Sequence, residues 1–382
     1  MRTKNIVGSW VAVLILIVVF FLGITYGFVS YRLTLPPYTF MMQTYLGIRD
    51  LKNRHASDAH ELSDDERSQM LEEIIHIKSS GDATEKRQEI IRILWGEEQL
   101  PDATNVKYKT NIETDRYHAL NNINNVDELV VEMEYGIQSR MHLFHPNVPN
   151  NELVIYHQGH RGDFIIGVEA IERFLGQGFS VLGVAMPLHG LNNRPVVDFP
   201  LQGTRKLIEH NQLPFLPIES GIAIKYFVEP VIIALNDLLQ KGSYSNINMV
   251  GVSGGGWTTT LVAAIDSRIT DSFSVAGTEP LMFSNKVPTE YEQISAELYS
   301  VISYFDLYIL SSTGNGRSHI QIHNKYDPCC NTGEKTELFL DILKERLLRI
   351  GGGEFDVLID ETHAEHAISS YTLDYISEKL MD

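Results

Sequence analysis

Two hydrophobic patterns alternate along the chain beyond residue 126. Short, densely apolar runs, as in 151–160 and 247–253, are typical of buried strands, because both faces of a parallel strand pack against helices. Longer segments with apolar residues three and four positions apart, as in 167–178 and 226–242, predict helices. Strands separated by helices predict an α/β fold, with a mostly parallel central sheet and helices on both faces.

Further segments continue this alternation. Residues 126–136 and 138–146 predict an antiparallel hairpin at the start of the sheet. Residues 191–220 are rich in proline and polar side chains and predict an insertion over the sheet edge. The remaining strands are expected at 179–190, 317–327 and 354–360, and the remaining helices at 258–269 and 334–352.

The region before the sheet, residues 30–115, has a different pattern. Ser63 with Glu66 three residues later forms a capping-box signature, and an apolar stripe follows at helical spacing. A second helix is predicted over 82–104, stopping around Gly96 and Pro101. We expect a helical extension that either forms a stalk or packs on the main domain at 116–382. It contains no residues that we identify as catalytic or ligand-binding candidates.

The amino terminus predicts a membrane anchor. Residues 6–29 are 24 consecutive residues without a charge, and at 1.5 Å per residue a helix of this length spans roughly 30 Å of hydrocarbon. Arg2 and Lys4 precede it and favour a cytoplasmic tip at 1–5. The expected protein is therefore single-pass, with its catalytic domain outside the cytoplasm.

Composition excludes some classes of function. With 49 acidic and 31 basic residues the net charge is −18, which argues against nucleic acid, because phosphate binding needs a basic surface. The two cysteines, Cys329 and Cys330, are adjacent and cannot build a disulfide framework. Two half-buried thiols are favoured over a vicinal disulfide.

The stretch "GVSGG", residues 251–255, ends an apolar strand and opens a helical pattern. In a strand–GxSxG–helix turn the serine takes a strained backbone conformation, and small residues are needed on both sides where strand and helix crowd. This context favours Ser253 as a nucleophile over a serine in an ordinary glycine-rich turn.

A nucleophilic serine needs donors for the oxyanion that forms on the substrate. Gly254, directly after Ser253, can offer its backbone N–H, and the loop after an earlier strand should supply the second donor. The segment "YHQGHRGD" lies after such a strand, so we expect the N–H of His160 there. Ordinary turn glycines are the alternative for this loop.

An acid and a base should follow later strands. Asp327 ends an alternating strand and precedes a proline, which predicts a turn there. The loop after the last strand offers His366, which we favour as the base, and His363 as the alternative. These two histidines could instead bind a metal, but no third ligand of matching spacing is evident. We expect neither a metal nor a cofactor.

The order Ser253, Asp327, His366 resembles the α/β-hydrolase superfamily. The nucleophile segment is similar to those of acetyl-xylan-esterase-like and prolyl-oligopeptidase-like members, although Gln158 stands where the oxyanion loop usually has histidine. The resemblance covers about 115–382. It implies an eight-stranded, mostly parallel sheet and hydrolysis of an ester or amide.

These observations predict a membrane-anchored carboxylesterase that acts on a small-molecule or carbohydrate ester through an acyl-enzyme on Ser253. A serine peptidase of the same fold is one alternative, but the region before 126 is too short and too helical for a propeller. A non-catalytic, membrane-tethered binding protein is the other. Substrate preference and oligomeric state are not determined by the sequence. Aromatic residues such as Trp257, Phe283 and Tyr304 could line a pocket or only pack the core.

Overall fold

The computed structural model describes Gly23, Tyr26 and residues 63–382, except for 114, 118–119, 161, 202, 285–287 and 382. No helix within this described part of the chain is both long enough and apolar enough to cross a membrane. Apart from Gly23 and Tyr26, the predicted anchor at 6–29 and the tip at 1–5 lie outside the described residues. The anchor therefore stays a prediction.

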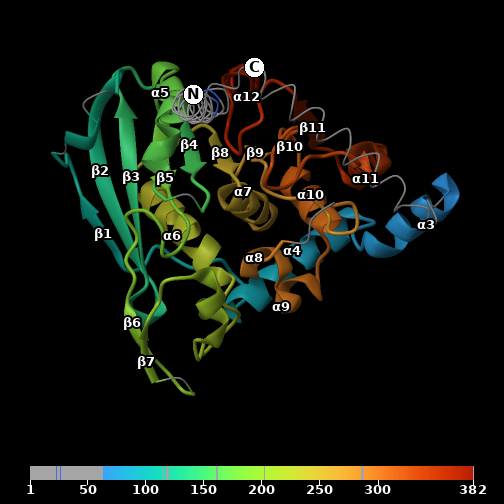
Figure 1. The fold of residues 1–382 in the computed structure, drawn as a ribbon, viewed down its shortest axis with the longest axis horizontal. Helices are drawn as coiled ribbons and strands as arrows, with labels where there is room; N and C mark the ends of the chain where they lie inside the picture. The colour runs from blue at the N-terminus through green and yellow to red at the C-terminus, as the bar shows by residue number, and fades with distance from the viewer. Residues whose placement is uncertain are drawn as a thin grey trace, which may run out of the picture.

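A single large sheet dominates the described residues, with nine strands in the order β1-β2-β3-β5-β4-β8-β9-β10-β11 (Figure 1). Pairing is antiparallel from β1 to β5 and parallel from β5 to β11. The strands are β1 Val106–Lys109, β2 Ile123–Glu132, β3 Gln138–Pro146, β4 Leu153–His157, β5 Ser180–Val184, β8 Ile247–Val252, β9 Asp271–Val275, β10 Ser318–Asn324 and β11 Glu354–Asp360.

The α/β prediction is confirmed, and so is the hairpin that begins the sheet, now β2 and β3. The expected number of eight strands is wrong for the described chain. β1, which falls in the region expected to be helical, pairs antiparallel with β2 from Val106 opposite Val131 to Lys109 opposite Glu128. This pairing satisfies backbone groups that β2 would otherwise expose along the sheet edge.

Helices cover both faces of the sheet. On one face α5 (Val168–Gly176) and α12 (Ser370–Lys379) enclose a core that includes Phe144, Phe174 and Phe273. The opposite face carries the larger core and a group of helices, α4 Ser80–Trp95, α6 Lys225–Lys241, α7 Gly254–Ile265, α10 Tyr304–Ser312 and α11 Leu340–Ile350. A parallel sheet enclosed in this way has densely apolar strands, as the sequence pattern indicated.

The two helices before the sheet pack on the larger core. Ser63 and Glu66 form the expected capping box at the start of α3 (Asp64–Ile74), and Gly96 ends α4 with a φ of 74°. Leu71, with Ile75 and Ile77 just after α3, is completely buried. The described part of the extension is therefore packed on the domain.

Residues 191–220 interrupt the alternation. They contain a two-stranded ribbon of β6 (Val196–Phe199) and β7 (Gly203–Lys206), followed by the short helix η4 (His210–Phe215). The loops that follow β4, β5, β8, β10 and β11 all leave the sheet at the carboxyl ends of its parallel strands. In open α/β sheets this edge is where ligands bind.

Candidate active site

Ser253 lies in a sharp turn between β8 and α7. Its backbone φ and ψ are 57° and −128°, in a region that costs a residue with a side chain about 1–3 kcal/mol. A Cβ atom on Gly251 would lie 2.2 Å from the carbonyl oxygen of Gly255, and one on Gly255 would lie 2.1 Å from that of His157. Both glycines are therefore required for strand and helix to approach so closely.

The loop after β4 lies directly against this serine. A Cβ atom on Gly159 would be only 2.6 Å from Cβ of Ser253, so the loop can occupy this position only with glycine there. Gly254 begins α7, and the first N–H groups of a helix have no intrahelical acceptor. A Cβ on Gly254 would lie 2.6 Å from Cε1 of His160, so the two expected oxyanion residues are neighbours.

Asp327 and His366 are brought together across the ends of β10 and β11. Nδ1 of His366 lies 2.5 Å from Oδ2 of Asp327, whose side chain is completely buried. The backbone N–H of Cys329 donates to the other carboxylate oxygen at 2.7 Å. An ionised carboxylate can only accept, so Nδ1 carries the hydrogen and leaves Nε2 as the basic nitrogen.

His363 has a different partner. Its Nε2 lies 3.5 Å from Oδ2 of Asp360, the last residue of β11. Asp360 also accepts from the N–H and hydroxyl of Thr362 and from the hydroxyls of Ser369 and Thr372. Burial raises the pKa of Asp360, but these donors together hold it below its usual range. His363 therefore lies beside Asp360, and it is His366 that lies against Asp327.

The cysteines differ from the prediction of two thiols. Cys329 and Cys330 form a vicinal disulfide. The turn in which the Cys329 N–H binds Asp327 brings both sulfur atoms together, and they lie within 4.8 Å of a ring nitrogen of His366. The disulfide is thus part of the wall around the acid–base pair.

Sequence reasoning missed a second polar cluster beside Ser253. His160, after β4, and His210, in η4, both face Glu292 in α8 (Tyr291–Ile294). Burial favours a raised pKa for Glu292, but the two imidazoles lower it to about 2. For His160 the two effects have the opposite signs. Burial lowers the pKa of the imidazole, but the Glu292 carboxylate raises it by more, so the pKa of His160 lies above its usual value. No periodicity or motif around these residues indicates that they meet.

Three of the aromatic residues for which the sequence left pocket lining and core packing open lie in the core. Trp257, Phe283 and Tyr304 are all buried. Trp257 donates from Nε1 to the hydroxyl of Tyr299, which in turn donates to that of Tyr304. Packing, not substrate contact, is therefore their role in this structure.

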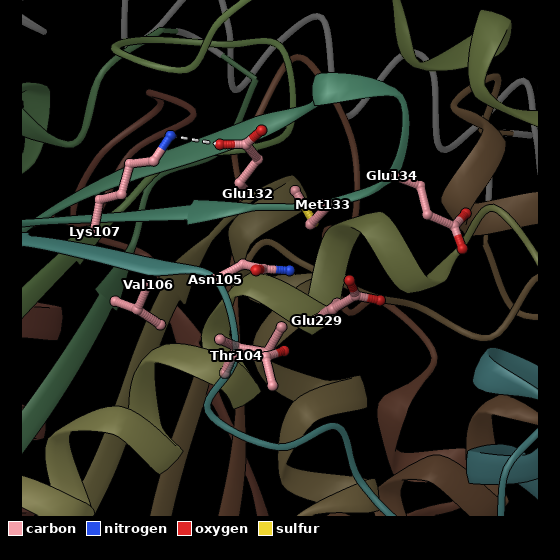
Figure 2. A pocket seen from close by; sticks show the side chains of 9 residues that line it. Thr104, Asn105, Val106, Lys107, Glu132, Met133, Glu134 and Glu229 are labelled. Atoms are coloured by element: carbon pink, nitrogen blue, oxygen red, sulfur yellow. Dashed lines mark hydrogen bonds and ion pairs between the residues drawn. The ribbon is translucent and has the colours of Figure 1, made fainter.

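A separate cleft lies near the β1 edge of the sheet, between β1, the end of β2 and α6 (Figure 2). Its lining includes the ion pair of Lys107 and Glu132 and the carboxylates of Glu134 and Glu229. β3, β5 and β4 separate β2 from β8, which leads into Ser253, so this cleft is not part of the candidate active site.

Strand order, the strained serine after β8 and the Asp–His pair after β10 and β11 define the α/β-hydrolase fold, which confirms the resemblance at the level of fold. No family model matches the chain, and no curated protein matches it in sequence.

Solved structures with the same fold include a glucuronoyl esterase from Solibacter usitatus, with a TM-score of 0.53 and 12% identity over 77% of this chain and 90% of that one. The methylesterase BT1017 gives a TM-score of 0.51 and 14% identity over 82% of this chain and 66% of that one. At such low identity these likenesses establish the fold and nothing finer.

Proposed function

We propose that the protein is a serine hydrolase that cleaves esters through an acyl-enzyme on Ser253. The observation that carries the proposal is the strained turn of Ser253 at the same sheet edge as the buried Asp327–His366 pair. A strained serine alone would be compatible with other roles. Combined with an imidazole oriented by a buried carboxylate, it fits the arrangement that activates a hydroxyl group.

In the proposed mechanism Nε2 of His366 accepts the proton of Ser253 as the oxygen attacks the carbonyl carbon. Asp327 holds the ring through Nδ1 and stabilises the imidazolium that forms. The N–H groups of Gly254 and His160 stabilise the oxyanion, a contribution worth about 10²–10³ in kcat per donor in other serine hydrolases. His366 then protonates the leaving alcohol, and water hydrolyses the acyl-enzyme by the reverse steps.

The choice of an ester as substrate rests on the structural neighbours. Two neighbours with TM-scores above 0.5 carry the names glucuronoyl esterase and methylesterase. We therefore propose an ester substrate, with carbohydrate esters as the first class to screen. Amides come second, because nothing in the described residues forms a propeller or comparable accessory domain that would select peptides.

Covalent labelling of the full chain tests the nucleophile. Wild type, Ser253→Ala and the control Ser245→Ala are treated with a fluorophosphonate, and their intact masses are recorded. One adduct on wild type and on the control, absent from Ser253→Ala, supports an activated Ser253. Absence of an adduct on folded wild type would overturn the proposal and favour a binding protein that keeps the fold. Turnover of short-chain aryl esters then tests the ester preference.

We also propose that residues 6–29 anchor the protein in a membrane with the catalytic domain outside the cytoplasm. The support is the uncharged apolar run behind Arg2 and Lys4. Resistance of the membrane-bound chain to alkaline extraction, and cleavage of its domain by external protease in intact cells, are the expected results. Release by alkali would contradict the anchor.

A further inference from the structure

Glu292 has no use in the proposed triad, and its surroundings are unusual. Its side chain is completely buried, and the only charged or polar side chains that pair with its carboxylate among the described residues are the rings of His160 and His210. Oε1 lies 3.0 Å from Nε2 of His160, and Oε2 lies 3.7 Å from Nδ1 of His210. Burying an ionised carboxylate is costly, so this group needs positive charge close to both of its oxygens, and His160 faces only Oε1.

The tautomer of His210 identifies what kind of partner fits. Its Nε2 lies 2.7 Å from the carbonyl oxygen of Pro187, and a carbonyl can only accept, so Nε2 carries the hydrogen. In the neutral ring, Nδ1 then presents a lone pair toward Oε2 of Glu292, which also presents lone pairs. Two acceptors facing each other repel unless a proton or a metal cation lies between them. Metal-binding histidines commonly donate their second ring N–H to a backbone carbonyl in this way.

We propose that His160, His210 and Glu292 form a binding site for a divalent transition-metal ion, with zinc as the preferred ion. One donor atom from each residue lies within 4.8 Å of the other two. Tetrahedral zinc with bonds of about 2.0–2.1 Å places its ligands about 3.3 Å apart. Each imidazole nitrogen lies near its own carboxylate oxygen of Glu292, at 3.0 Å from Oε1 for His160 and 3.7 Å from Oε2 for His210, distances comparable with this value. Two histidines and one glutamate are a known zinc ligand set that leaves a fourth position open.

The position of this site gives it a consequence for the enzyme. Its ligands come from three separate segments, the loop after β4, η4 in the insertion and α8. His160 is also the residue whose N–H is expected in the oxyanion hole, and its ring lies against Gly254. A bound ion would therefore tie the oxyanion loop to the insertion and to α8. The ring of a third histidine, His189, has its centroid 5.8 Å from that of His160 and 5.0 Å from that of His210.

The experiment measures metal binding directly and so does not depend on the proposed esterase activity. The full chain carrying Ser253→Ala is stripped with chelator, dialysed against Zn²⁺ or Co²⁺, and analysed for metal content and for the visible spectrum of cobalt. We expect one ion per chain and the intense cobalt absorption of a four-coordinate site. In this background a second substitution, Glu292→Gln or His210→Gln, should weaken binding of the metal ion at least about 100-fold. This is the upper end of the loss seen when a residue that only hydrogen-bonds to a metal ligand is replaced.

His145→Gln is the matched control, because Nε2 of His145 lies 2.9 Å from a carboxylate oxygen of Asp127 in a comparable pair far from Glu292 in the fold. It should leave the stoichiometry and the cobalt spectrum unchanged. Failure of the stripped chain to bind either ion would overturn the proposal and favour a doubly protonated His210 as the partner of Glu292. Undiminished binding by Glu292→Gln would also overturn it. Should His210→Gln not fold, the near-isosteric Glu292→Gln decides alone, with circular dichroism as the folding check.

Discussion

Replacing Ser253 with glycine should make the folded chain more stable than replacing it with alanine. The backbone of Ser253 has φ 57° and ψ −128°, which glycine adopts freely and any residue with a Cβ adopts at a cost of about 1–3 kcal/mol. The hydroxyl of Ser253 makes no capping hydrogen bond in α7, so neither variant loses one there. The two variants therefore differ mainly in backbone strain.

The expected difference follows from two opposing terms. Relief of strain favours glycine by about 2 kcal/mol, the middle of the range above, and the greater freedom of glycine in the unfolded chain costs about 0.5–1 kcal/mol. A net gain of about 1 kcal/mol remains. In a folded chain of this size it corresponds to a rise in Tm of about 1–2 °C, because the entropy of unfolding grows with chain length.

Thermal unfolding of the two purified variants, followed by circular dichroism, measures this difference, and urea unfolding checks its sign. Ser68 in α3 is the matched control, because it is an exposed helical serine. There alanine should be more stable than glycine by about 1 kcal/mol. If Ser253→Gly proved equal to or less stable than Ser253→Ala, the turn would not be strained and the argument for a nucleophile held on it would fail.

Three further predictions concern the triad, the oxyanion loop and the core. Asp327→Asn should fold normally but lower kcat about 10⁴-fold, because asparagine can hold His366 in the wrong tautomer. Steady-state ester hydrolysis measures this loss, and a decrease in kcat of less than tenfold would refute the prediction. Gly159→Ala should abolish turnover, since its Cβ would lie 2.6 Å from that of Ser253, whereas Gly242→Ala, with open space around it, should not. Burial, followed by Arg317, lowers the pKa of His319 to about 3, so between pH 6.5 and about 3 only the unfolded chain binds this proton. On acidification across this window His319 should by itself lower the free energy of unfolding by about 1.4 kcal/mol per pH unit, and His319→Gln should reduce the measured slope by that amount in urea titrations at several pH values.

The elements that hold the proposed triad could be predicted from the sequence because each has a local cause. The apolar run of β8 and the glycines around Ser253 are needed because residues close together in the chain crowd one another in the turn between strand and helix. The placement of Asp327 and His366 at one edge follows from the rule that parallel strands end on the same side. Only the choice between His366 and His363 needed the structure, since it depends on the network around Asp360.

Other features have no local signal. β1 is a four-residue strand that exists because β2 offers an unpaired edge, and its sequence alone is too short and too polar to predict it. The Cys329–Cys330 disulfide depends on the turn that Asp327 shapes. Glu292 lies in a short helix whose sequence carries no motif. Only the folded chain shows that His160 and His210 face this carboxylate.

The sequence by itself thus determined the class of fold and the strained turn, and it named the candidate nucleophile, acid and base in their order along the chain. These properties depend on hydrophobic periodicity and on contacts between near neighbours, which a single sequence records directly. Tertiary structure alone decided which histidine reaches Asp327 and which distant side chains gather beside Ser253. Those outcomes depend on loops folding over the sheet edge, where positions far apart in the chain become neighbours without leaving any pattern in the sequence.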